Sequence, residues 1–146
     1  MKNKAVRLLS FLTLCCMLLL LALAVLAPWL IRAYAELRKL SEQSAAAILI
    51  AFYACFLPSL LALICLFRLL RNILRERVFA DVNSSLMAVI SWCCAGVAAA
   101  TLAAAYWYLP LLLMTASMLF LFLTVRVVRN CFIAAIEVKR ENSLTI

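Results

Sequence analysis

The stretch from Leu86 to Val125 reads LMAVISWCCAGVAAATLAAAYWYLPLLLMTASMLFLFLTV, which is forty residues without a charged side chain. As one helix it would extend ~60 Å at ~1.5 Å per residue, about twice the thickness of the hydrocarbon core of a membrane. It therefore has to turn back on itself. The rings of Tyr106, Trp107 and Tyr108 favour a membrane interface, and Pro110 suits the first turn of a new helix. The sequence predicts a tight hairpin of two membrane spans, residues 86–108 and 110–128.

Two more apolar runs precede this hairpin, at residues 8–31 and 45–67. Each is longer than the ~20 residues that cross a hydrocarbon core. The chain of 146 residues is 70% hydrophobic with a mean hydropathy of +1.17, whereas soluble domains are roughly half apolar. One Gly and three Pro leave little material for loops. We therefore predict an all-α, integral membrane four-helix antiparallel bundle, a single transmembrane domain over residues 1–146 with a helical tail at 129–146.

Two features of the first pair of runs leave alternatives open. The chain starts Met-Lys-Asn-Lys and continues to Ala-Val-Leu-Ala at residues 24–27, a pattern that also suits a cleaved signal peptide. A membrane span is favoured because the apolar segment exceeds a usual signal core. In the second run, Pro58 removes one backbone hydrogen bond and is expected to kink the helix, either as a hinge or as a tolerated proline.

Lysine and arginine are distributed unequally around the four spans. Only Arg32, Arg38 and Lys39 lie between the first and second spans, and eleven others lie on the opposite side. The positive-inside rule assigns the side with more Lys and Arg to the cytoplasm. We therefore predict a multi-pass membrane protein with both termini in the cytosol, so that a cytosolic partner is favoured over an external ligand. The eleven are Lys2, Lys4, Arg7, Arg68, Arg71, Arg75, Arg77, Arg126, Arg129, Lys139 and Arg140.

Acidic side chains and histidine are missing from all four predicted spans. The chain contains no His, and its six acids lie outside the apolar runs. Proton-coupled transport usually requires an ionisable group within the membrane, and the common acid–base and triad chemistries require His or paired carboxylates. We therefore predict no catalytic residues and no cofactor, and the protein is not expected to be an enzyme. The six acids are Glu36, Glu42, Glu76, Asp81, Glu137 and Glu141.

Seven cysteines are numerous for a chain of this size. The vicinal pairs Cys15–Cys16 and Cys93–Cys94 lie at similar depth in the first and third spans, ~10 to 13 Å from the cytosolic ends. If those helices touch, four thiols meet, and thiolates select Cu(I) or Zn. The alternative is that these are small, inert hydrophobic residues, since vicinal cysteines lack the spacing of zinc and redox motifs. Cys15, Cys16, Cys93 and Cys94 are weak candidates for a metal site.

Small residues recur on the third span. Gly96, Ala100 and Ala104 follow one another at four-residue spacing. Such faces let helix backbones approach closely in lipid, where helices gain nothing from the hydrophobic effect. The face is predicted to serve packing within the bundle, with a homodimer as the alternative.

The connection between the second and third spans is basic. Arg68, Arg71 and Arg75 follow the second span at helical spacing. They are expected to continue that helix into the headgroup layer and contact anionic lipid, worth ~1 kcal/mol each near the surface. Docking of a protein is the alternative, and the sequence does not separate the two. Asn83 or Ser84 is a natural N-cap for the third helix.

Two short elements of the sequence match a known pattern. Phe79 and Asn83 form a Phe-x-x-x-Asn element before the third span, and Phe132 precedes the ending VKRENSLTI at residues 138–146. In both, the chain resembles the YoaS-like family, small bacterial membrane proteins with a domain of unknown function, which end in Leu-Lys-x-Glu-Asn-Asp-Leu-Thr-Ile. The resemblance implies a four-span protein of the bacterial cell (inner) membrane, often encoded beside a small helix-turn-helix regulator, and it supplies no known activity.

We therefore expect a regulatory or accessory membrane protein that recruits or restrains a cytosolic helix-turn-helix regulator and does not itself bind nucleic acid. A dimeric transporter of small molecules or ions is an alternative, although no span carries an acid, and a thiol-based metal or redox sensor is another. The candidate partner-binding residues are Arg68, Arg71, Arg75, Phe79, Asn83, Phe132, Glu137, Lys139, Glu141, Leu144, Thr145 and Ile146.

Overall fold

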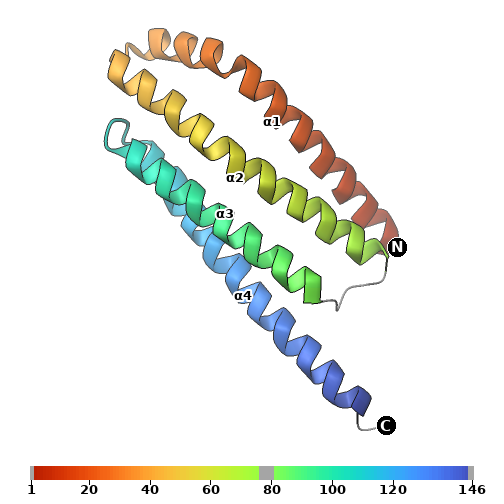
Figure 1. Ribbon diagram of the computed structural model, residues 1–146. Coiled ribbons are helices and arrows are strands. Elements are labelled where there is room, and N and C mark those ends of the chain that lie inside the picture. The colour runs from red at the N-terminus through yellow and green to blue at the C-terminus, as the bar shows by residue number, and fades with distance from the viewer. Residues whose placement is uncertain (1, 76–80, 145–146) are drawn as a thin grey trace.

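The computed structural model describes residues 2–75 and 81–144, and this part of the chain is helical apart from short turns. Figure 1 shows the four helices, α1 (Lys2–Arg38), α2 (Glu42–Leu74), α3 (Asp81–Ala105) and α4 (Leu111–Leu144). Each is long and apolar enough to cross a membrane. The prediction of an all-α protein with four spans is confirmed, and the chain is a multi-pass membrane protein.

The helices run antiparallel and pack in chain order. α1 contacts α2, α2 contacts α3, and α3 contacts α4. Within the described ranges no Cα atom of α1 lies within 8 Å of α3 or α4, and none of α2 lies within 8 Å of α4. The arrangement is therefore a curved, open array, and it differs from the predicted bundle in that α1 and α4 do not close it.

The array has two chemically different ends. The basic end is where α1 and α3 begin and where α2 and α4 end. The aromatic end is where α1 ends and α2 begins, together with the α3–α4 turn. Figure 1 shows α4 extending past the start of α3 at the basic end.

Three of the four helices are much longer than the spans predicted for them. α1 has 37 residues, α2 has 33 and α4 has 34. Apolar composition identifies only the part of a helix that lies in hydrocarbon, and a helix continues until the backbone is interrupted. α1 ends where Lys39 takes the left-handed conformation (φ 49°) and the Leu40 amide donates to Ala35 O at 3.0 Å, which is a Schellman stop. α2 begins behind Ser41, whose side chain accepts from the Ser44 amide.

The predicted α3–α4 hairpin is confirmed. α3 ends at Ala105 and α4 begins at Leu111, directly after Pro110. Hydrogen bonds attach this turn to both other helices at the aromatic end. The Tyr34 and Tyr108 hydroxyls lie 2.6 Å apart, and Ser44 Oγ donates to Trp107 O at 3.2 Å. The turn therefore fixes the aromatic end of the whole array.

Polar side chains join neighbouring helices inside the spans. The buried hydroxyls of Thr101 and Thr115 lie 2.9 Å apart and link α3 to α4. The Tyr53 hydroxyl of α2 donates to Ala24 O of α1 at 3.1 Å. Pro28 follows Ala24 by four residues inside α1, and a proline cannot donate to the carbonyl four residues earlier. Tyr53 thus supplies the hydrogen bond that Pro28 removes.

Candidate functional site

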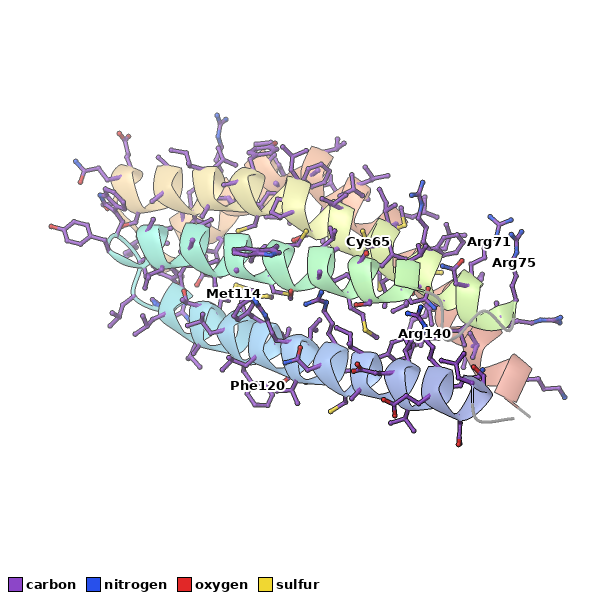
Figure 2. All side chains as sticks on the ribbon, turned by 60° about the horizontal axis from the view of Figure 1, so that its bottom comes forward. Cys65, Arg71, Arg75, Met114, Phe120 and Arg140 are labelled. Atoms are coloured by element: carbon purple, nitrogen blue, oxygen red, sulfur yellow. The ribbon has the colours of Figure 1, made fainter. Side chains whose placement is uncertain are left out.

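The last turns of α2 carry an exposed row of arginines at the basic end. Arg68, Arg71 and Arg75 are all exposed, and their spacing of three and four residues places them along one side of the helix. Figure 2 shows Arg71 and Arg75 at the end of α2, at the same end of the molecule as Arg140 of α4. We call Arg68, Arg71 and Arg75 the arginine row. It presents three positive charges just beyond the most apolar part of α2.

A hydrogen bond between two asparagines joins α2 to α3 beside the arginine row. Asn72 Nδ2 donates to Asn83 Oδ1 at 2.9 Å. Asn83 is fully buried, with 0% of its surface exposed, so a partner cannot reach it without separating the two helices. The expected N-cap role of Asn83 or Ser84 is not observed, because α3 begins earlier, at Asp81. Asn83 therefore acts within the array, as a joint between helices.

α4 is attached to the start of α3, close to the Asn72–Asn83 hydrogen bond. Arg129 Nε donates to Ser84 O, in the first turn of α3, at 3.1 Å. Arg129 is only partly exposed, so this charge-assisted bond forms in a partly water-excluded setting, where such bonds are stronger than neutral ones. The Asn72–Asn83 and Arg129–Ser84 bonds together fix the ends of α2, α3 and α4 relative to one another.

The C-terminal part of α4 projects from the array as a continuous helix. Its 34 residues extend about 50 Å, roughly 20 Å more than a hydrocarbon core requires. The sequence predicts a helical tail at residues 129–146, and α4 is helical as far as Leu144, the last residue that the structure describes. Among the predicted partner residues, Phe132 is partly buried, and Glu137, Lys139, Glu141 and Leu144 are exposed. Phe79, Thr145 and Ile146 lie outside the described residues.

Arg126 lies within the span of α4, between two aromatic rings. Its Cζ atom is 5.6 Å from the ring centroid of Phe122, one turn back on α4, and 6.0 Å from that of Trp92 on α3. A charge near the centre of a spanning helix costs roughly 2.5–3.5 kcal/mol, less toward the interface. A cation over an aromatic ring recovers roughly 0.5–1 kcal/mol, and about 2 when it is desolvated. The two rings offset part of the cost of placing this charge in the membrane. They carry no negative charge, so the guanidinium has no counter-ion there.

Three of the predicted thiols face one cavity. Cys16 of α1 and Cys93 and Cys94 of α3 line an apolar cavity of about 430 Å³ to which α2 and α4 also contribute. Cys15 does not line it and is exposed. All seven cysteines are free thiols, and no three His, Cys, Asp or Glu side chains of the described residues are close enough to hold a metal ion. In the described ranges no Cα atom of α1 lies within 8 Å of α3, and Cys15 lies outside the cavity, so the four thiols are not brought together.

The small residues of α3 divide between two environments. Ala104 is buried at 7% exposure and Ala100 is partly buried; both line a groove of about 580 Å³ between α2 and α3. A Cβ atom on Gly96 would meet nothing within 4 Å. Ala104, at the end of the stripe nearest the turn, is thus its buried member, and Gly96 lies on an open surface.

Two elements of the site were not recognised from the sequence. Asn72 was not recognised, although an asparagine among the arginines at the end of a helix could have indicated a hydrogen bond to a neighbouring helix. Trp92 carried no signal by itself. Its proximity to Arg126 depends on the register between α3 and α4, which spacing along one helix does not contain.

These features define a class of protein: a multi-pass helical membrane protein with a basic, hydrogen-bonded end. The model of a family of proteins of unknown function, DUF2975, matches residues 8–146. The chain belongs to this family. No curated protein and no solved structure matches it. The family has no assigned activity, and the YoaS-like name stays a prediction.

Proposed function

We propose that this protein is a regulatory or accessory component of a bacterial cell membrane that holds a cytosolic protein partner at its basic end. One observation carries the proposal: the arginine row of α2 and the projecting helix of α4 lie at the same end and are tied together by the Asn72–Asn83 and Arg129–Ser84 bonds. A surface that is already ordered loses less conformational entropy on binding. The proposed role requires no catalysis.

The orientation is part of the proposal. Eleven of the fourteen Lys and Arg belong to the basic end or its connections, and the positive-inside rule places such an end in the cytoplasm. Both termini are then cytosolic. A green fluorescent protein fused after Ile146 should fluoresce, whereas an alkaline phosphatase fused there should be inactive. The opposite pair of results would move the partner to the other side of the membrane.

The partner that we propose is the helix-turn-helix regulator implied by the YoaS-like resemblance. Such a protein reads DNA through a basic surface, which the arginine row would repel. It would therefore contact the row through an acidic surface elsewhere, and α4 would supply the apolar contact of Leu144, which is 80% exposed. Contact of this kind leaves the DNA-binding surface of the regulator uncovered, and it keeps the regulator at the membrane.

The test is crosslinking in native membranes followed by affinity purification and mass spectrometry. Two variants remove parts of the proposed surface: Arg68→Gln/Arg71→Gln/Arg75→Gln, and a deletion of residues 141–146. The matched control, Arg32→Gln/Arg38→Gln/Lys39→Gln, removes three charges at the aromatic end. Recovery of a helix-turn-helix protein should fall in both variants and persist in the control. Equal recovery from all three proteins would refute the proposal.

A thiol-based sensor is the second candidate, because Cys16, Cys93 and Cys94 face one cavity. Under this alternative, mild oxidation or Cu(I) in native membranes should protect these three thiols from alkylation and leave exposed Cys131 reactive. Equal alkylation with and without treatment would remove this candidate. A dimeric transporter has less support, since no acidic side chain lies in any of the four apolar spans predicted from the sequence.

A further inference from the structure

Arg126 lies deeper in the membrane than the other polar contacts of the basic end. Arg129 bonds to the first turn of α3, and Arg126 is three residues, or ~4.5 Å, closer to the aromatic end. Its guanidinium lies against Phe122, and Phe122 precedes it by four residues, so the side chain leans further into the span. In the described ranges Arg126 makes these ring contacts and no hydrogen bond or ion pair. It is a cation in the membrane that lacks an anion.

A groove on the outer surface of the array begins beside the same tryptophan. It has a volume of about 670 Å³, lies between α2 and α3, and is lined almost entirely by apolar atoms. Trp92, which is 67% exposed, borders the groove and also contacts Arg126. Toward the basic end the groove is bordered by Ile64 and Val89, and toward the middle of the membrane by Leu57 and Pro58. Its long direction is thus that of an acyl chain in the adjacent leaflet.

We propose that Arg126, Trp92 and this groove bind one anionic phospholipid of the leaflet at the basic end, with its phosphate on the Arg126 guanidinium and an acyl chain along the groove. Guanidinium donors match phosphate oxygens as a fork. The pairing is stronger here than in water because the guanidinium lies within the span, where the dielectric constant is low. A phospholipid combines the missing anion with an apolar chain at this depth. The site does not depend on which side of the membrane the basic end faces.

This site differs from the general attraction of the arginine row to anionic lipid. Arg71 and Arg75 are exposed near the end of α2, where salt screens charges over ~10 Å at ~0.1 M ionic strength. Arg126 is also exposed on the protein surface, but it lies inside the span, where the surroundings are lipid, so its pairing should be screened far less. Binding at Arg126 should therefore persist at salt concentrations that remove the diffuse attraction.

Quenching of Trp92 fluorescence by brominated lipids tests the proposal. The chain has three Trp, at positions 29, 92 and 107, so Trp29→Phe/Trp107→Phe leaves Trp92 as the reporter. The purified protein is reconstituted in phosphatidylcholine vesicles that contain either dibrominated phosphatidylglycerol or dibrominated phosphatidylcholine. We expect an apparent preference of about fivefold for the anionic lipid at the Trp92 site, the factor that one arginine supplies near a membrane surface. It should persist in high salt and in the presence of inorganic phosphate.

Arg126→Gln should abolish the preference, whereas the matched control Arg140→Gln, an exposed arginine of the projecting helix, should leave it unchanged. Equal quenching by both lipids would overturn the proposal. So would loss of the preference in Arg140→Gln to the same degree, because the attraction would then be diffuse. If Arg126→Gln does not reconstitute, Arg126→Lys keeps the charge without the fork and should lose the preference in high salt. An unchanged preference in that variant would also refute the site.

Discussion

Replacement of Tyr53 by Phe should destabilise the contact between α1 and α2, because Tyr53 supplies a hydrogen bond that α1 cannot make for itself. Pro28 leaves Ala24 O without its intrahelical donor, and the Tyr53 hydroxyl donates to that oxygen at 3.1 Å. Tyr53 is 45% exposed, but in a span the surroundings are lipid, which offers no substitute hydrogen bond. The Phe variant thus leaves a backbone carbonyl unsatisfied.

The structure allows the size of this effect to be estimated. A hydrogen bond contributes roughly 0.5–1.5 kcal/mol to the free energy of unfolding, and helix–helix bonds in membranes average about 0.6 with a maximum near 1.7 kcal/mol. We expect Tyr53→Phe to lower the unfolding free energy by about 1 kcal/mol. In a chain that also carries Pro28→Ala, residue 28 regains an amide that can donate to Ala24 O. Tyr53→Phe should then have an effect below about 0.3 kcal/mol, half of the average membrane bond.

The assay is reversible unfolding in mixed micelles, followed by circular dichroism, for the four proteins of this double-mutant cycle. Tyr106→Phe is the matched control, because Tyr106 is 88% exposed at the α3–α4 turn; its unfolding free energy should stay within roughly 0.5 kcal/mol of the parent. Equal destabilisation by Tyr53→Phe with Pro28 and with Ala at position 28 would refute the reasoning. The ring of Tyr53 would then matter through packing, and its hydroxyl would not be replacing the lost proline donor.

Three further substitutions test other joints by the same measurement. Asn83→Ala should lower the unfolding free energy by about 1–3 kcal/mol, because it leaves Asn72 Nδ2 without this partner; an effect under 0.5 kcal/mol, the roughly neutral range of surface changes, would exclude the joint. Lys39→Gly should raise it by up to about 1 kcal/mol, since a non-glycine residue is strained at φ 49°, and a decrease would contradict the Schellman stop. Thr101→Val should lower the unfolding free energy by only about 0.6 kcal/mol, because Thr115 keeps its own bond to Leu111 O. A loss above about 2 kcal/mol would show that the Thr101–Thr115 pair contributes far more than an average hydrogen bond between membrane helices.

The number of helices and the hairpin between the last two could be predicted because one physical limit governs both. A charge-free stretch of forty residues exceeds the thickness of a membrane as a single helix, and it contained its own interface markers at residues 106–110. The helix ends could not be predicted in the same way. α1 runs from Lys2 to Arg38, well past the apolar run at 8–31, because its polar ends continue the helix until Lys39 turns the backbone.

The site was predictable only in its charges. The arginine row follows from helical spacing, and all three side chains are exposed. Asn83 was expected on a surface and is fully buried, because its environment depends on where Asn72 meets α3. The vicinal cysteines were expected to gather only if α1 touched α3, and that contact is not made in the described part of the chain. Residue spacing along one helix does not show which side chains of two different helices come together.

Packing in chain order bears on how the protein is made. In the part of the chain that the structure describes, each helix contacts only its immediate neighbours along the sequence. During synthesis every helix after the first therefore enters the membrane beside a partner that is already present. Contacts between neighbouring segments also close short loops, which favours rapid association. A chain truncated after α2 would contain the complete α1–α2 contact, and one truncated after α3 would also contain the α2–α3 contact.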